Sequence, residues 1–292
     1  MYRMDMEDIK GHEVARRAIE IAVAGRHNIM MFGLPGSGRT MMARRITTLF
    51  STETQFRAPH HTISVQGLVG GGVPLFPGEV TRAHNGVLFL DEFQEFRKSV
   101  LECLKTPVSE RAIVFTRNGS SITMPCDFML VAAMDWCPCG KEGDHCTCAF
   151  EEVKRHWTRV NAFLRDYFDV YADMWLMPYK QCINLPKGES SATMLNRIKI
   201  ARNRQLARFA GEMTTCNSGI ATIHLKDHCV LEPAAVKALE DYINEYGVDA
   251  KGFDKTLRVA RTVADLADSE NISLEHIEEA IQLRVLPRKD KD

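Results

Sequence analysis

The sequence predicts an α/β domain with a largely parallel sheet, followed by an all-helical region. Three continuous apolar runs carry the first prediction, at residues 28–33, 86–92 and 127–134. Such runs are typical of strands that helices cover on both faces. Amphipathic segments alternate with these runs, and this alternation favours a parallel sheet. The amphipathic segments are Val14–Ala24, Met41–Phe50 and Ser99–Lys105.

The second half of the chain has a different pattern of apolar residues, which favours helices. A polar helix is expected at about residues 151–167, and the rough alternation of Phe168–Pro178 predicts an edge strand. From about residue 188 onward the periodicity is helical throughout. The expected helices are Ser190–Arg208, Glu232–Tyr246, Gly252–Ala267 and Ser273–Leu286. We therefore expect two parts, an α/β domain at residues 1–187 and a helical subdomain at residues 188–292.

Composition narrows the class of protein. The chain has 37 Lys and Arg against 38 Asp and Glu, which argues against a nucleic-acid binder that relies on a basic tail, although a local basic groove stays possible. No apolar run is long enough to span a membrane, and the acidic start does not fit a signal peptide, so we expect a cytoplasmic protein. Nine cysteines in a reducing compartment then need a role other than disulfide bonding.

A glycine-rich loop follows the first predicted strand. Residues 33–40 read GLPGSGRT and lead into a predicted helix, which fits the phosphate-binding frame except that Arg39 stands where lysine is usual. Glycines allow positive φ, so that backbone N–H groups can surround phosphate oxygens. The alternative to a phosphate-binding loop is a glycine-rich turn that binds no ligand. The predicted nucleotide-binding residues are Gly33, Pro35, Gly36, Ser37, Gly38, Arg39, Thr40 and Met41.

An acidic pair ends the second apolar run about 50 residues further on. Thr40 is predicted to place its hydroxyl on a bound Mg²⁺, and Asp91 to hold the ion through water. Glu92 is predicted to orient or deprotonate the attacking water. In combination with the glycine-rich loop, this pair predicts a site for ATP or ADP with Mg²⁺.

Several blocks carry a resemblance to a known family. FRAPHHTIS, GEVTRAHNGVLFLDEF, VAAMDWCPCG and LRVARTVADLA, together with the glycine-rich loop, resemble the Mg-chelatase-like AAA+ ATPases of the YifB/ComM type from about residue 9 to residue 286. The resemblance implies a three-layer α/β/α P-loop AAA+ domain with a C-terminal helical lid. It also implies a homo-oligomeric ring, usually of six subunits, with nucleotide between neighbours. The N-terminal Lon-protease-like domain of ComM proteins is expected to be absent.

The family suggests two activities. ComM-type proteins are implicated in branch migration of DNA, so the resemblance implies DNA processing. Mg-chelatase relatives instead drive metal insertion into a porphyrin, which makes a chelatase motor subunit a second, less favoured function.

Departures from the family pattern fall on its catalytic residues. Arg39 replaces the lysine, and Asp135 stands at the sensor position, where the family has asparagine. A carboxylate cannot donate a hydrogen bond to the γ-phosphate and repels it. The arginine that would reach a neighbouring subunit is displaced unless Arg165 takes its role, and the lid arginine falls on Lys255 with Arg258 nearby. These departures predict an ATPase that binds nucleotide but hydrolyses it slowly. An inert nucleotide-binding regulatory subunit is the alternative.

A cysteine-rich loop follows Asp135. Two Cys-x-Cys pairs at residues 137–148 are spaced so that four thiolates can surround one tetrahedral Zn²⁺, with His145 as a substitute ligand. The alternative is a reduced surface loop without metal. The predicted zinc ligands are Cys137, Cys139, Cys146 and Cys148.

Two segments are candidates for contact with DNA. Residues 110–123 predict a hairpin with a turn at Asn118-Gly119 and positive charge from Arg111 and Arg117. Residues 56–77 have the composition of a long functional loop. Within it, the adjacent pair His60-His61 is expected to form structural hydrogen bonds rather than to bind a metal. A solvated hairpin that touches no nucleic acid is the alternative.

Overall fold

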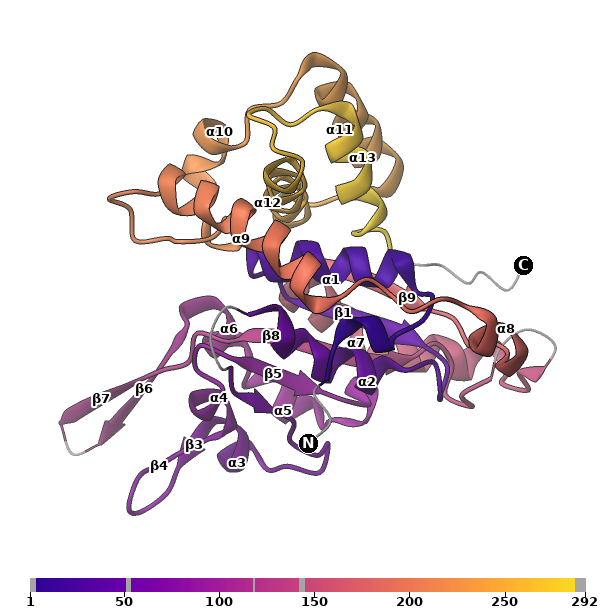
Figure 1. Cartoon of the computed structure of the whole chain (residues 1–292). Helices are drawn as coiled ribbons and strands as arrows, with labels where there is room; N and C mark the ends of the chain where they lie inside the picture. The colour runs from indigo at the N-terminus through magenta and orange to yellow at the C-terminus, as the bar shows by residue number, and fades with distance from the viewer. Residues whose placement is uncertain (1–3, 51–53, 118, 142–144, 287–292) are drawn as a thin grey trace. The chain divides into compact units, whose positions relative to one another are not determined.

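The computed structural model describes residues 4–50, 54–117, 119–141 and 145–286, and its largest sheet is parallel (Figure 1). The strand order in this sheet is β2-β5-β8-β1-β9. The strands are β1 (Ile29–Gly33), β2 (Phe56–Arg57), β5 (Val87–Leu90), β8 (Met129–Asp135) and β9 (Val170–Met174). The three apolar runs thus form the three inner strands, and the predicted edge strand β9 lies at one edge, so both predictions are confirmed.

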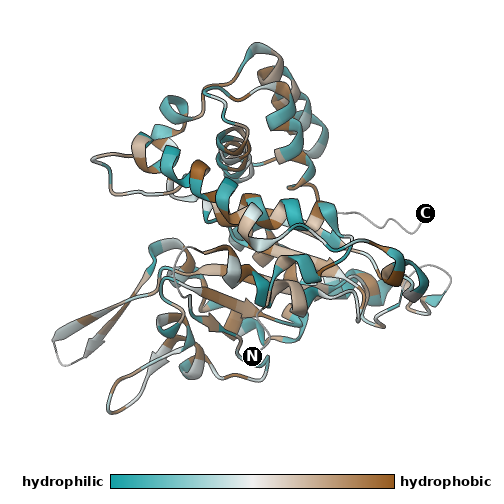
Figure 2. Cartoon of the chain, in the orientation of Figure 1, coloured by the Kyte–Doolittle hydropathy of each residue, from teal (hydrophilic) through white to brown (hydrophobic). Residues whose placement is uncertain are grey.

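The strand register brings the carboxyl ends of neighbouring strands to one edge of the sheet. Val87 of β5 is aligned with Met129 of β8, and Leu90 is aligned with Ala132. The inner strands are buried almost throughout, and the centre of the sheet is predominantly brown in Figure 2. In parallel α/β sheets, ligands bind beyond the carboxyl ends of the strands, and this edge is where Asp91 and the loop after Gly33 begin.

The expected helices are present, some of them shorter than expected. The helix expected at Met41–Phe50 changes to a 3₁₀ turn at Ile46–Leu49. The last helix ends at Gln282 rather than at residue 286, and the Leu283 carbonyl just beyond it accepts a hydrogen bond from the Tyr171 N–H of β9 at 2.7 Å. The helices are α1 (Glu13–Gly25), α2 (Arg39–Arg45), α3 (Val65–Val69), α4 (Glu79–Arg82), α5 (Lys98–Glu102), α6 (Lys105–Glu110), α7 (Phe150–Tyr167), α8 (Tyr179–Asn184), α9 (Ser191–Arg208), α10 (Leu225–His228), α11 (Pro233–Tyr246), α12 (Ala250–Leu266) and α13 (Leu274–Gln282).

Two hairpins extend from the same part of the molecule (Figure 1). β6 (Ala112–Arg117) pairs with β7 (Ser120–Pro125), which confirms the predicted hairpin. Its turn residue Asn118 lies outside the described residues. The shorter hairpin pairs β3 (Gly70–Gly71) with β4 (Phe76–Pro77). The two hairpins approach each other at Gly70, where an added Cβ atom would lie 3.5 Å from the Phe115 ring.

The chain forms two compact units. The sheet unit consists of Met30–Phe168 and Met174–Leu185, and the helical unit of Met1–Ile29, Asp169–Asp173 and Pro186–Asp292. The N-terminal helix α1 therefore packs with the C-terminal helices, although the sequence expectation placed it in the first domain. The division at residues 187–188 into separate domains stays a prediction. Among the described residues, no helix is both long enough and apolar enough to cross a membrane.

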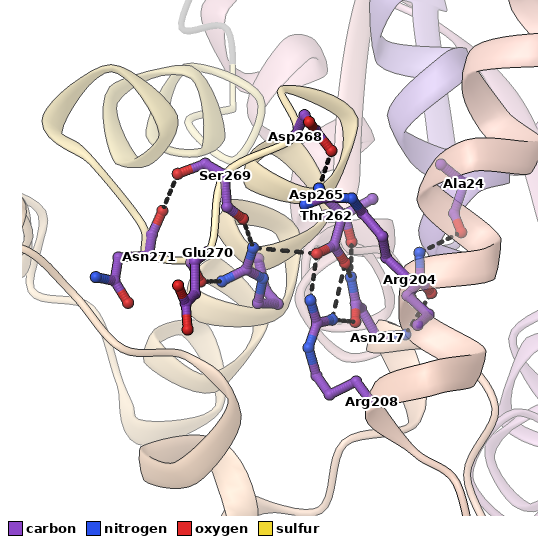
Figure 3. A network of polar contacts seen from close by, with 12 residues as sticks. Ala24, Arg204, Arg208, Asn217, Thr262, Asp265, Asp268, Ser269, Glu270 and Asn271 are labelled. Atoms are coloured by element: carbon purple, nitrogen blue, oxygen red, sulfur yellow. Dashed lines mark hydrogen bonds and ion pairs between the residues drawn. The ribbon is translucent and has the colours of Figure 1, made fainter.

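A buried polar network stabilises the helical unit (Figure 3). Asp265 of α12 is fully buried and forms ion pairs with Arg208 and Arg261. Asn217 Nδ2 donates to Asp265 Oδ2 at 2.8 Å. The guanidinium of Arg261 also donates to the carbonyls of Ser269 and Glu270. Arg261 is 1% exposed, and its hydrogen bonds to these two carbonyls hold the turn after α12 in place.

Candidate nucleotide-binding site

The phosphate loop joins β1 to α2, as the sequence predicts. Gly36 has φ +87° and Gly38 has φ +91°, conformations that favour glycine. Gly33 has no room for a side chain, because a Cβ atom there would lie 2.5 Å from the Met174 carbonyl oxygen. The backbone of this loop is thus held in a form that leaves N–H groups available for an anion.

Ser37 supplies an independent sign that the loop accommodates a ligand. Its side chain is buried, and its hydroxyl has no hydrogen-bond partner among the described residues. Buried polar groups are usually satisfied, so a hydroxyl without a partner beside glycines of positive φ fits a loop built around phosphate oxygens.

Thr40 and Asp91 meet as a magnesium site requires. The Thr40 hydroxyl donates to Asp91 Oδ2 at 2.7 Å. Two neighbouring ligands of an octahedral Mg²⁺ with bonds near 2.1 Å lie about 3.0 Å apart. Only a small movement would let these two oxygens share a cation, so the residues fit Mg²⁺.

Glu92 lies beside the expected magnesium ligands but is paired with a histidine. His61 Nδ1 lies 2.9 Å from Glu92 Oε2, and Glu92 has φ +51°, in the left-handed region. The neighbouring His60 instead contacts the Thr62 hydroxyl through Nδ1 at 2.9 Å. The expectation of structural hydrogen bonding therefore holds for His60, whereas the carboxylate partner of His61 was missed.

Arg39 and Asp135 form an ion pair at the centre of the site. Arg39 Nη2 donates to Asp135 Oδ1 at 2.5 Å, and both side chains are largely buried. Gln94 approaches the other carboxylate oxygen at 3.4 Å. A lysine and an asparagine at these positions would carry one positive charge, whereas arginine and aspartate together carry none. The site therefore offers an incoming phosphate one positive charge less than a site with lysine and asparagine would.

Aromatic packing fixes the backbone at Asp135. The ring of Trp136 stacks on Phe32 with centroids 4.7 Å apart, and its centroid lies 5.6 Å from that of Trp157. His156 Nε2 lies 2.9 Å from the Asp135 carbonyl oxygen, so that a protonated Nε2 donates to it. These contacts join β1, the end of β8 and α7 next to the start of the phosphate loop, since Phe32 directly precedes Gly33.

The predicted lid residues already have partners within the helical unit. Lys255 Nζ lies 3.2 Å from Asp169 Oδ1, and both groups are mostly buried. Arg258 Nε donates to the Ile220 carbonyl at 2.8 Å. Arg165 is exposed on the last turn of α7, in the sheet unit. The roles of Lys255 and Arg258 toward nucleotide, and of Arg165 toward a neighbouring subunit, stay predictions.

The four predicted zinc ligands lie together in the loop after β8. The sulfur atoms of Cys137, Cys139, Cys146 and Cys148 all lie within 4.8 Å of one another. Residues 142–144 between the two pairs lie outside the described residues. The predicted alternative ligand His145 is exposed.

Sheet, flanking helices and C-terminal helical region together define an α/β protein with an AAA+ type of architecture. A family model described as magnesium chelatase, subunit ChlI, matches residues 5–55 and 50–182. The model for the C-terminal part of the same subunit matches residues 188–284. The chain therefore belongs to this Mg-chelatase family.

Individual relatives agree with this assignment. The chain is 34% identical over 97% of its length to the uncharacterized protein YifB of Salmonella typhimurium, and 34% identical over 98% of its length to the competence protein ComM of Haemophilus influenzae. It covers 61% of each of these relatives. A magnesium-chelatase 67 kDa subunit of Chlorobaculum parvum is 26% identical over 44% of the chain and 23% of that protein.

Two contacts at the site were not foreseen from the sequence. The His61 contact depends on the pairing of β2 with β5, which aligns Phe56 with Val87 and places the loop after β2 beside Glu92. The contact between Arg39 and Asp135 is not predicted from the sequence either, although each residue is unexpected for the resemblance described above. Their opposite charges were the available signal, and the order of β1 and β8 in the sheet makes them neighbours.

Proposed function

We propose that this chain is the ATP-binding AAA+ module of a ComM-type DNA-processing protein, with weakened ATP hydrolysis. The phosphate loop and the Thr40–Asp91 pair support nucleotide and Mg²⁺ binding. The similarity to ComM and YifB over almost the whole chain supports the DNA-processing class. Glu92 is the proposed residue that orients the attacking water.

The Arg39–Asp135 ion pair carries the proposal of weakened hydrolysis. An incoming γ-phosphate must draw Arg39 away from Asp135, and the carboxylate left behind repels the charge that develops in the transition state. Guanidinium is also planar and bulkier than an ammonium group, so it fits differently between phosphate oxygens.

A set of variants tests this proposal through ATP turnover. We expect slow release of phosphate from the wild type and at least about tenfold faster release from the Arg39→Lys/Asp135→Asn double variant, equivalent to about 1.4 kcal/mol in the barrier. Adding Glu92→Gln to the double variant should abolish this gain. Wild-type turnover at about 10 s⁻¹, a common enzyme rate, would contradict the weakening.

The same experiment separates the inert regulatory subunit from a slow ATPase. An inert subunit binds ATP in equilibrium measurements but releases no phosphate, either as wild type or as the double variant. Glu92 next to Asp91 favours the slow ATPase, because a subunit without turnover has no need for an acidic residue at that position.

DNA binding and ring assembly are the less direct parts of the proposal. The two hairpins approach each other in the sheet unit and are the proposed contact with DNA. Arg111 Nη1 before β6 lies 3.6 Å from Asp127 Oδ1, which compensates its charge. The side chain of Arg117 is outside what the structure describes. We expect binding to single-stranded DNA that weakens steeply with salt, measured by fluorescence anisotropy. Ring formation with ATP and Mg²⁺ is measured by light scattering, with six copies expected.

The chelatase motor function is less well supported. The similarity to the magnesium-chelatase 67 kDa subunit covers less than half of the chain, whereas the similarity to ComM covers almost all of it.

A further inference from the structure

We propose that Cys137, Cys139, Cys146 and Cys148 bind one structural Zn²⁺ ion, and that this ion stabilises the phosphate loop through the contact between Gly140 and Pro35. The cysteine set lies in the loop between β8 and α7. This inference concerns a second cation site, distinct in chemistry and position from the Mg²⁺ site expected at Thr40 and Asp91.

The distances between sulfur atoms match a tetrahedral zinc site. Zn–S bonds near 2.3 Å in a tetrahedron place neighbouring sulfur atoms about 3.8 Å apart. Cys137 Sγ lies 3.4 Å from Cys146 Sγ and 3.6 Å from Cys139 Sγ, and the distance from Cys139 Sγ to Cys146 Sγ is 3.7 Å. A disulfide would need about 2.05 Å. The sulfur atoms are thus converged on a common centre and not bonded in pairs.

Ligand chemistry selects the metal. Thiolates are soft ligands that favour Zn²⁺ over Mg²⁺, which prefers oxygen. Four protein ligands leave no open position for water or substrate, and such a closed site is structural rather than catalytic. Cys137 is buried, while the other three cysteines are half-buried, so an ion can enter from the surface.

The loop that carries these cysteines packs directly on the phosphate loop. Gly140 lies between the two pairs with φ +65°, and its N–H donates to the Cys137 carbonyl at 2.9 Å. A Cβ atom on Gly140 would lie 2.9 Å from Cγ of Pro35. Metal binding at Cys139 and Cys146 fixes the chain on both sides of Gly140, and thereby the residue that packs against Pro35 of the phosphate loop.

Metal content tests the site itself. The full chain, purified under reducing conditions without added chelator, should contain one zinc per chain by plasma mass spectrometry. Replacement by Co²⁺ should give the absorption of tetrahedral thiolate coordination. The Cys139→Ser/Cys148→Ser variant should lose the zinc, whereas Cys182→Ser, which alters an exposed thiol outside the cluster, should retain it. Wild type without stoichiometric zinc, or a cluster variant that keeps it, would overturn the site.

Hydrogen exchange tests the coupling without relying on nucleotide binding. Amides of residues 33–40 should exchange about tenfold faster or more in the cluster variant than in wild type, because a wall of the loop is released. Gly140→Ala keeps all four thiolates and should also accelerate exchange at residues 33–40, because the added Cβ would lie 2.9 Å from Pro35 Cγ and the φ of +65° disfavours any side chain. Unchanged exchange at residues 33–40 in both variants would overturn the coupling even if zinc were present. Loss of ATP binding alone would instead concern the proposed function.

Discussion

Arg39 Nη2 and Asp135 Oδ1 lie 2.5 Å apart, so the guanidinium of the phosphate loop is paired with the carboxylate at the end of β8. The negative charge of the aspartate neutralises the guanidinium. Neither residue is left with a buried unpaired charge, which would be strongly destabilising. The pair therefore preserves the fold while it changes the electrostatics that an incoming phosphate meets.

The first prediction concerns nucleotide affinity. Asp135→Asn removes a carboxylate that competes with phosphate for Arg39, so ATP should bind about tenfold more tightly, or about 1.4 kcal/mol. Isothermal titration calorimetry measures the change. Asp166→Asn on α7, an exposed carboxylate in the same compact unit, serves as the control and should leave the affinity unchanged. Equal affinities for Asp135→Asn and wild type would show that the pair does not compete with nucleotide.

The second prediction concerns the magnesium ligands. Thr40→Ala removes a hydroxyl that donates to Asp91, so the dependence of ATP binding on Mg²⁺ should be largely lost. Thr40→Ser keeps the hydroxyl and should retain that dependence. Binding is titrated with and without Mg²⁺, and a Thr40→Ala protein that still requires the metal would exclude this role.

The third prediction concerns the His61 contact with Glu92. In the Arg39→Lys/Asp135→Asn background, His61→Ala should free the carboxylate to orient water and raise kcat about tenfold, with no change in ATP affinity. His60→Ala is the matched control, since the neighbouring ring contacts Thr62 instead. A fall in kcat would mean that His61 positions Glu92 for the reaction rather than holding it back.

The fourth prediction concerns stability against pH. Burial lowers the pKa of His27 from 6.5 to about 4, although the nearby Asp169 opposes the shift. The unfolded chain therefore binds a proton that the folded chain excludes, and stability falls as pH drops from about 6.5 toward 4. The loss from this group is on the order of 3 kcal/mol.

Urea denaturation at several pH values measures the effect of His27. His27→Gln should show a shallower loss of stability across this pH range. His224→Gln, which replaces an exposed histidine of the same helical unit, should follow the wild type. Parallel curves for His27→Gln and wild type would assign the loss to other groups.

The fifth prediction concerns the network in Figure 3. Asp265→Asn leaves the buried guanidinium of Arg261 without its carboxylate, so the free energy of unfolding should fall by about 3 kcal/mol. Asp268, three residues after Asp265, forms an ion pair with Arg204, and Asp268→Asn breaks that pair. Because Asp268 is 75% exposed, that variant should lose less than about 1 kcal/mol. Similar losses for both variants would show that burial does not set the strength of this network.

Most of the fold could be predicted from local pattern. Apolar runs such as residues 86–92 predicted inner strands, because a parallel strand is covered on both faces. The start of the helix expected from Ser190 is also close to the structure, where the Ser190 hydroxyl accepts a hydrogen bond from the N–H of Thr193 at 3.2 Å. Helix ends were less predictable, since α13 ends at Gln282 although the periodicity favours a helix to Leu286.

The sequence by itself determined which chemical groups the phosphate site contains. The spacing from Gly33 to Thr40 and the acidic pair at residues 91–92 are local features, which can be recognised in the sequence alone. The Cys-x-Cys pairs of the neighbouring loop are local in the same sense. Tertiary structure alone decided which charges meet. Arg39 lies 96 residues from Asp135, and His61 lies 31 residues before Glu92, and each pair is joined by strand order and register in the sheet. Pairing of charges across such separations depends on distance in space, which residue spacing does not encode.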